Sequence, residues 1–142
     1  VQEFLPNVVV KYAPGVTTGS FPPFDTITLG RLEPTENETL AILAHEMGHI
    51  TTGVKFPKAP TDSLRYFLRE LEADIAGERF ASEWGILNEY YSQVREGVQY
   101  LITRMSPKSL ILLPMSLKPD HIKMLIRCHV PPIPGPWKEN PW

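Results

Sequence analysis

The sequence has little of several features that define other classes of protein. A single cysteine, Cys128, allows no disulfide within the chain, which favours either a reducing compartment or indifference to redox conditions. The longest apolar run, 110–113, is far too short to span a bilayer and is followed by Pro114. The formal net charge of −2 gives no electrostatic attraction for nucleic acid or an anionic membrane. No signal peptide is visible, so we expect a cytoplasmic protein that binds neither nucleic acid nor membranes.

Length and composition fit one small domain. With 142 residues, of which 42% are hydrophobic, the chain can bury one core but not two. We expect a single domain over 1–142, with a sheet and core helices in 1–105 and a C-terminal appendage in 106–142.

The most informative segment is His-Glu-Met-Gly-His at 45–49. A helix turns about 100° per residue, so His45 and His49 lie one turn apart on one face, and both imidazoles can bind one zinc ion. Glu46 flanks the pair, where its carboxylate can take a proton from zinc-activated water and pass it to a leaving amine. Catalytic zinc has three protein ligands and leaves the fourth position to water, so a third ligand is needed.

A second predicted helix supplies this ligand from the segment 63–74. We assign Glu70, because Asp74 lies one turn further along the same face and can accept a hydrogen bond from a ligand histidine. Glu72 points roughly 200° away from Glu70. The small residues Ala73 and Gly77 beside this face would let the two helices approach closely enough for both to reach one ion.

The two motifs, HExxH at 45–49 and ExxxD at 70–74, resemble those of the gluzincin metallopeptidases, including the ImmA/IrrE-like and HtpX-like groups. The other large zincin branch has a glycine and a third histidine where this chain has Thr52 and Lys55. The short chain looks most like the minigluzincins, small archaeal-type proteins regarded as self-inhibited. The alternatives are a surface helix that carries two histidines by chance and a solvated acidic face on the second helix.

The resemblance implies a peptidase that acts on peptides or proteins. It implies one zinc ion per chain, with the first Glu of the second motif as the third ligand and its Asp as the group that orients a histidine. These roles fall on Glu70 and Asp74.

Two strands are predicted ahead of the first motif, at 8–12 and 25–29. The loop between them ends in 21–24, which should be extended because of its prolines. The second strand precedes the catalytic helix, where gluzincins have the edge of the active-site cleft. An edge strand could bind a peptide substrate as an added strand, although it could equally be an ordinary sheet edge.

Helix signals follow. The capping box at 35–38 predicts a helix that begins just after Thr35 and ends near Gly53. Asp62 is the predicted N-cap of the ligand helix, which runs to about Trp84. A third helix is predicted over 86–105. Its tyrosines could stabilise an oxyanion but are more often core or surface residues; they are Tyr90, Tyr91 and Tyr100.

The last part of the chain predicts a short helix over 119–129, with Pro119 in its first turn. Residues 130–142 are too rich in proline for a helix or central strand; their tryptophans favour docking, which includes contacts in an oligomer. His121 or His129 could stabilise the transition state, although a lone histidine is more often structural. Cys128 could block zinc as a thiolate, although a buried, inert cysteine is the more common case.

We therefore expect an α+β fold of gluzincin type: a small mixed sheet with an active-site edge strand packed on two zinc-binding helices, and a helical and extended C-terminal appendage. The expected activity is zinc-dependent peptide-bond hydrolysis with Glu46 as general base and acid. The region after Pro119 is expected to restrain this activity as a prosegment, as in a zymogen, with a structural strap as the alternative. A catalytically silent zinc-binding regulatory or interaction module shares every motif residue and is the competing function.

Overall fold

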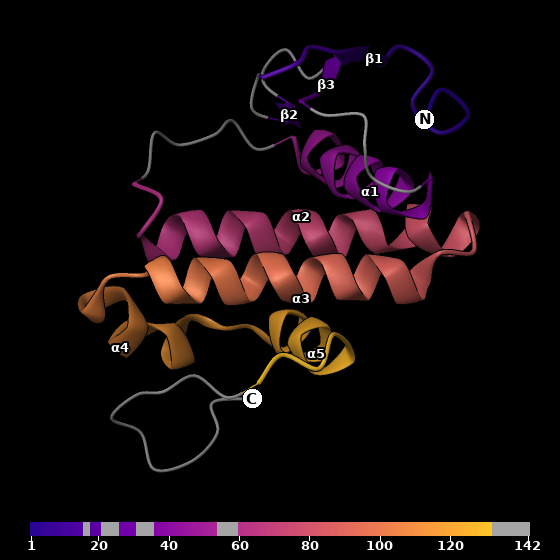
Figure 1. Ribbon diagram of the computed structural model, residues 1–142. Coiled ribbons are helices and arrows are strands. Elements are labelled where there is room, and N and C mark those ends of the chain that lie inside the picture. The colour runs from indigo at the N-terminus through magenta and orange to yellow at the C-terminus, as the bar shows by residue number, and fades with distance from the viewer. Residues whose placement is uncertain (16–17, 21–25, 31–35, 54–59, 132–142) are drawn as a thin grey trace.

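The computed structural model describes residues 1–15, 18–20, 26–30, 36–53 and 60–131. Over these residues, three short strands are followed by five helices, an arrangement compatible with the predicted α+β class (Figure 1). None of these helices is both long and apolar enough to cross a membrane. The elements are β1 (Val9–Tyr12), β2 (Gly19–Ser20), β3 (Thr26–Leu29), α1 (Glu36–Thr52), α2 (Leu64–Glu83), α3 (Leu87–Arg104), α4 (Pro107–Ser116) and α5 (Pro119–Arg127).

β3 lies at the centre of the sheet. It pairs in parallel with β1, with Val9 opposite Thr26, and antiparallel with β2, with Gly19 opposite Thr28. The sheet is mixed as expected, but the prediction that the strand before α1 is an edge strand is wrong. β2 occupies its second side, and a strand of two residues leaves no alternating pattern by which the sequence could show it.

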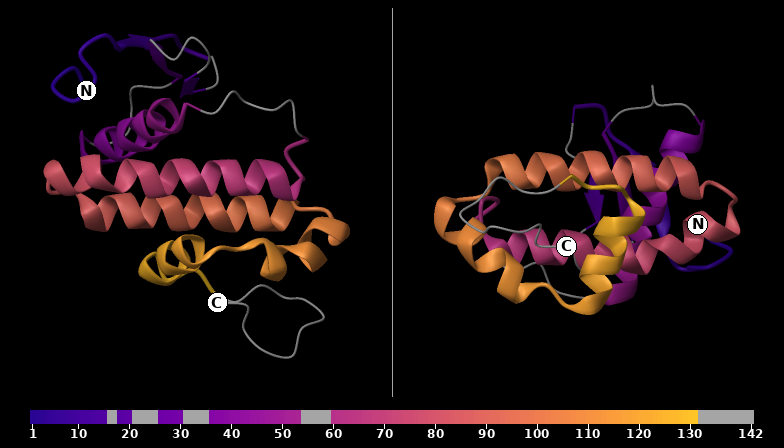
Figure 2. Two further views of the ribbon diagram at one scale, coloured as in Figure 1. Left: turned by 180° about the vertical axis from the view of Figure 1, so that it is seen from behind. Right: turned by 90° about the horizontal axis from the view of Figure 1, so that it is seen from below.

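The sheet packs mainly on α1 rather than on both ligand helices (Figure 1). Ile27 and Leu29 are buried and alternate with half-buried threonines, as in a strand with one face in the core. α1 lies across α2 and α3, which run side by side in opposite directions. The views in Figure 2 place α4 and α5 on the far side of this pair from α1.

The boundaries of the first three helices agree closely with the predicted ones. α1 ends at Thr52, before Gly53 with a φ of 61°; the predicted cap at Thr35 lies outside the described residues. α2 begins one residue later than expected, because the N-cap is Ser63 and not Asp62. The Ser63 hydroxyl accepts a hydrogen bond from the Tyr66 backbone amide, which satisfies one of the free donors at the helix start.

The appendage contains more helix than the sequence predicted. α4 was not anticipated, since Pro114 was expected to stop the apolar run, yet the helix continues past it to Ser116. α5 begins at Pro119 as predicted, and its buried Met124 and Leu125 belong to the hydrophobic core. The described part of the appendage is thus built into the domain. The inhibitory role expected of the region after Pro119 stays a prediction, and its residues 132–142 lie outside the described residues.

α1 and α2 approach so closely that glycine is required at two positions of their contact. A Cβ atom at Gly48 would collide with the backbone carbonyl of Ala73, and one at Gly77 with the backbone carbonyl of Ala44. The close approach expected from Ala73 and Gly77 is therefore present, and Gly48 is the matching residue on α1. This contact brings the ligand-bearing faces of the two helices together.

We predict that Gly77→Ala destabilises the domain by about 1–3 kcal/mol, because the added methyl group overpacks the helix contact. Gly97→Ala is the matched control: a Cβ there meets nothing within 4 Å, and alanine at this exposed helix position should stabilise by about 0.5–1 kcal/mol. Urea unfolding of the metal-free proteins measures both changes. Equal stability of the two variants would contradict the close contact.

Candidate metal centre

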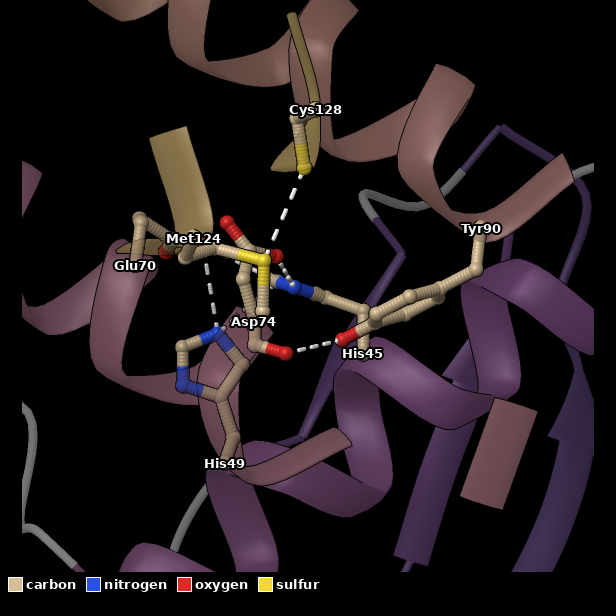
Figure 3. Close-up of polar contacts among 7 residues, drawn as sticks. All are labelled: His45, His49, Glu70, Asp74, Tyr90, Met124 and Cys128. Carbon is tan, nitrogen blue, oxygen red and sulfur yellow. Dashed lines mark hydrogen bonds and ion pairs between the residues drawn. The ribbon is translucent and has the colours of Figure 1, made fainter. Parts of the chain in front are cut away.

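His45 and His49 project from successive turns of α1 towards Glu70 of α2 (Figure 3). The Nε2 atoms of the two histidines lie 3.1 Å apart. Glu70 Oε2 is 3.0 Å from the Nε2 atom of His45 and 3.3 Å from that of His49. The three residues form a group that could hold a metal ion, and they are the three that the sequence assigned.

The geometry of this triangle fits tetrahedral coordination of a metal ion. Ligand bonds of about 2.0–2.1 Å place neighbouring ligand atoms roughly 3.3 Å apart at tetrahedral angles. The observed separations of 3.0, 3.1 and 3.3 Å are close to this value. Two imidazole nitrogens and a carboxylate oxygen that converge in this way need a cation between them, either a metal ion or a proton. The donor set, His₂Glu, is one that catalytic zinc uses.

Asp74 fixes the orientation of His45. Its Oδ1 atom lies 2.6 Å from His45 Nδ1, and because a carboxylate accepts, the Nδ1 atom carries the proton and leaves Nε2 facing the ligand triangle. The predicted contact between Asp74 and a ligand histidine is thus present. The backbone carbonyl of Asp74 also accepts a hydrogen bond from the buried hydroxyl of Tyr90 on α3 (Figure 3). Three helices therefore hold the His45 ring in place.

Burial and charge strongly shift the pKa values of His45 and Glu70. Burial would lower the pKa of His45, but the nearby carboxylates of Asp74 and Glu70 raise it well above its usual value. Burial also opposes ionisation of Glu70, yet hydrogen bonds from His45 and His49 hold its pKa well below the usual range. A proton on His45 therefore balances part of the negative charge that a metal ion would otherwise neutralise.

Glu46 and Tyr66 lie close to the ligand group. Glu46 is buried and is not one of the three ligand residues, as its predicted role as a base requires. Tyr66, one turn before Glu70 on α2, was missed from the sequence. Its hydroxyl hydrogen-bonds to Glu70, and burial, Glu70 and Glu46 all raise the pKa of Tyr66. The four-residue spacing from Glu70 was the signal that could have revealed it.

The three tyrosines proposed as transition-state stabilisers, Tyr90, Tyr91 and Tyr100, lie in different surroundings. The Tyr90 hydroxyl donates a hydrogen bond to the backbone carbonyl of Asp74. Tyr91 donates to Glu78 at 2.6 Å. Tyr100 is 56% exposed, and the Arg104 guanidinium lies over its ring. None of these observed contacts involves the ligand atoms.

The two remaining histidines and the cysteine belong to the α5 region. His121 is buried, accepts a hydrogen bond at Nδ1 from the Lys118 amide and places Nε2 3.8 Å from Glu72. His129 is exposed and has a φ of 56°. Cys128 is buried beside Met124, and burial raises the pKa of its thiol to about 12. It is therefore a neutral thiol near neutral pH, which fits the inert cysteine rather than a zinc-blocking thiolate.

No protein-family model matches this chain, and no curated protein or solved structure is significantly similar to it. The functional assignment therefore depends on the residues and geometry of the metal centre. Among the described residues, His45, His49 and Glu70 form the one cluster of His, Cys, Asp and Glu side chains with ligand geometry.

We predict that Asp74→Asn weakens zinc binding roughly 10- to 100-fold, because the amide accepts a weaker hydrogen bond from His45 Nδ1. Glu72→Gln is the matched control, since it removes a carboxylate from α2 that pairs with Arg69 and His121 instead. Competition with a chromophoric zinc chelator gives both affinities. Equal loss in the two variants would mean that general negative charge, and not the contact with His45, governs affinity.

Zinc binding should release a proton at neutral pH. Asp74 and Glu70 raise the pKa of His45 in the metal-free protein, so this imidazole is charged there and must lose its proton to act as a ligand. Affinity should therefore rise with pH until the raised pKa of His45 is passed. Calorimetric titrations in two buffers with different ionisation enthalpies should show about one proton released per zinc ion. Release near zero would show that His45 is already neutral without metal.

Proposed function

We propose that this chain is a zinc metallopeptidase of gluzincin type that hydrolyses peptide bonds in peptides or proteins. The observation that carries the proposal is the ligand triangle formed by His45, His49 and Glu70, with Asp74 behind His45. Buried Glu46, next in sequence to a ligand histidine, adds the base that hydrolysis needs. A purely structural zinc site would use a closed set of four protein ligands, whereas the three ligands among the described residues would leave one position for water.

Each residue would have a defined part in the reaction. When bound, zinc supplies a Lewis acid that brings the pKa of a coordinated water towards about 7 and polarises the substrate carbonyl. His45, His49 and Glu70 would hold the ion. Glu46 would accept a proton from the attacking water and deliver it to the amide nitrogen as the C–N bond breaks. The hydroxyl of the water would remain on the carbonyl carbon, so no covalent acyl-enzyme is required.

The supporting residues would keep this arrangement rigid. Asp74 would keep the proton of His45 on Nδ1, which directs the Nε2 lone pair to the ion. Tyr66 would donate its hydroxyl hydrogen to Glu70 and so orient the third ligand. The inhibitory role is expected of the region after Pro119, of which residues 132–142 lie outside the described part of the chain.

The decisive experiment separates metal binding from turnover. We predict that Glu46→Gln retains one zinc ion per chain but cleaves a generic peptide mixture at least about 100-fold more slowly, because its proton acceptor is gone. Glu70→Gln is the contrasting variant and should lose both zinc and activity. Metal content by elemental analysis and cleavage by mass spectrometry test both.

The same experiment identifies the competing function. If the wild-type chain binds zinc stoichiometrically but cleaves no peptide, with or without residues 132–142, it is a silent zinc-binding module on this scaffold. If deletion of 132–142 raises cleavage without altering zinc content, the tail is inhibitory. A chain that binds no zinc would contradict the proposal outright.

A further inference from the structure

α4 and α5 form an outer layer of the domain. Both helices lie on the far side of the α2–α3 pair from α1 and the sheet, and both contact α2 (Figure 2). Leu113 of α4 and Met124 and Leu125 of α5 are buried and belong to the hydrophobic core. The opposite faces of these two helices therefore point away from the domain.

The outward face of α4 is apolar. Ile111 is 56% exposed and Met115 80%, and Leu112 beside them is exposed as well. At about 100° per residue, these three side chains and Lys108 fall within roughly 100° of one another, on the side of the helix away from Leu113. A surface helix normally has a polar outer face, whereas α4 is apolar on both sides. Several exposed apolar residues on one face are typical of a contact surface.

The charged residues near this face are mostly basic. The segment 104–131 has five Lys or Arg residues and one acidic residue, Asp120, so its formal charge is +4, although that of the whole chain is −2. Lys108, Lys118 and Lys123 are exposed, and none of them forms an ion pair with another described residue. The total charge of the chain thus conceals a basic region in the outer layer.

α5 repeats the combination of apolar and basic residues. Ile126 is exposed and lies one turn from Lys123, on the side of the helix away from its buried residues. Arg127, in contrast, is paired with Glu78 of α2 at 3.0 Å. The outward faces of α4 and α5 therefore both place apolar side chains beside lysines that have no partner within the described part of the domain.

An anionic lipid surface fits this combination. Apolar side chains enter the boundary between headgroups and acyl chains, while lysines beside them are attracted to acidic headgroups. A second copy of this chain fits less well. In a symmetric dimer the same face of each copy meets the other, so the lysines of the two copies would repel one another. The sequence after Pro131 also contains Trp137 and Trp142, and tryptophan is enriched at membrane interfaces.

We propose that the outward face of α4 and α5 docks the domain peripherally on an anionic lipid surface; the face comprises Lys108, Ile111, Leu112, Met115, Lys123 and Ile126. This differs from the expectation of no membrane binding, which was drawn from the total charge of the chain. The α2–α3 pair would separate the lipid from α1, so the metal-ligand group would remain outside the lipid (Figure 1). Docking would depend neither on zinc nor on the proposed peptidase activity.

The test measures cosedimentation of the full chain with vesicles of phosphatidylcholine alone and with vesicles that contain about one third phosphatidylserine. The wild type should bind the anionic vesicles at least roughly tenfold more tightly, and added salt should weaken this binding because it screens the lysines. Replacing both Lys108 and Lys123 with Gln should weaken binding to anionic vesicles roughly 20- to 30-fold, since each lysine contributes about fivefold. Met115→Glu should weaken it at least about tenfold, because an anion replaces an apolar side chain.

Val9→Glu is the matched control for Met115→Glu. It adds the same charge at an exposed apolar residue of β1, on the opposite side of the domain, and should bind as the wild type does. Thermal unfolding shows whether each variant is folded. A polarity-sensitive dye attached to Met115→Cys should shift to shorter wavelengths on anionic vesicles, whereas the same dye on Val9→Cys should not. Cys128 is buried and would not take the label.

Equal binding of the wild type to both kinds of vesicle, or to neither, would overturn the proposal. So would an equal loss in Met115→Glu and Val9→Glu, or binding without a dye shift at position 115. A dimer that forms without vesicles and dissociates in Met115→Glu would assign the face to a second copy instead. Failure of the proposed function has a different signature, since a chain that binds vesicles but no zinc has the docking face without the metal centre.

Discussion

The close contact of α1 with α2 is the constraint on which the rest of this structure depends. Gly48 lies against the Ala73 carbonyl, and Gly77 lies against the Ala44 carbonyl. Each pair replaces side-chain packing with direct approach of one helix backbone to another. This separation lets two short imidazoles and one carboxylate meet within about 3.3 Å of one another. A wider contact would leave the carboxylate of α2 out of reach of the histidines of α1.

α3 supports the ligand residues that α1 and α2 bring together. The Tyr90 hydroxyl donates a hydrogen bond to the backbone carbonyl of Asp74. A Cβ atom at position 77 would collide with this hydroxyl, so Gly77 leaves room for it. Through Asp74 this contact reaches the ring of His45. The same helix face continues through Val94 and Gly97 along a cavity of about 180 Å³ beside His45 and Glu70. A single amphipathic helix thus supports the ligand network at one end and shapes the adjoining space along its length.

The ligand residues could be predicted from the sequence because their spacing is local. His45 and His49 are one helical turn apart, as are Glu70 and Asp74, and a helix converts such spacing into a shared face whatever the tertiary fold. Gly48 could not be assigned, since its need for glycine depends on which residue of α2 faces it. Tyr66 had the correct spacing from Glu70, but a lone tyrosine on a helix has many more common roles.

The sheet and the appendage were harder to predict for a different reason. The central position of β3 depends on β2, a two-residue strand whose pairing is a long-range contact without a local pattern. α4 contains Pro114, which argues locally against helix, yet the helix continues and buries Leu113. Ser63 and Asp62 are both good caps, and the choice between them follows from the exact start of α2.

The ligand triangle also has a mechanical consequence. His45 and His49 belong to one helix and Glu70 to the next, so an ion bound to all three would join the two helices as a cross-link does. The chain between His49 and Glu70 would then form a closed loop, with less conformational entropy to gain on unfolding. The ion would consequently stabilise the folded domain in addition to any part it takes in a reaction. The resistance of the fold to unfolding would then vary with the free zinc concentration around it.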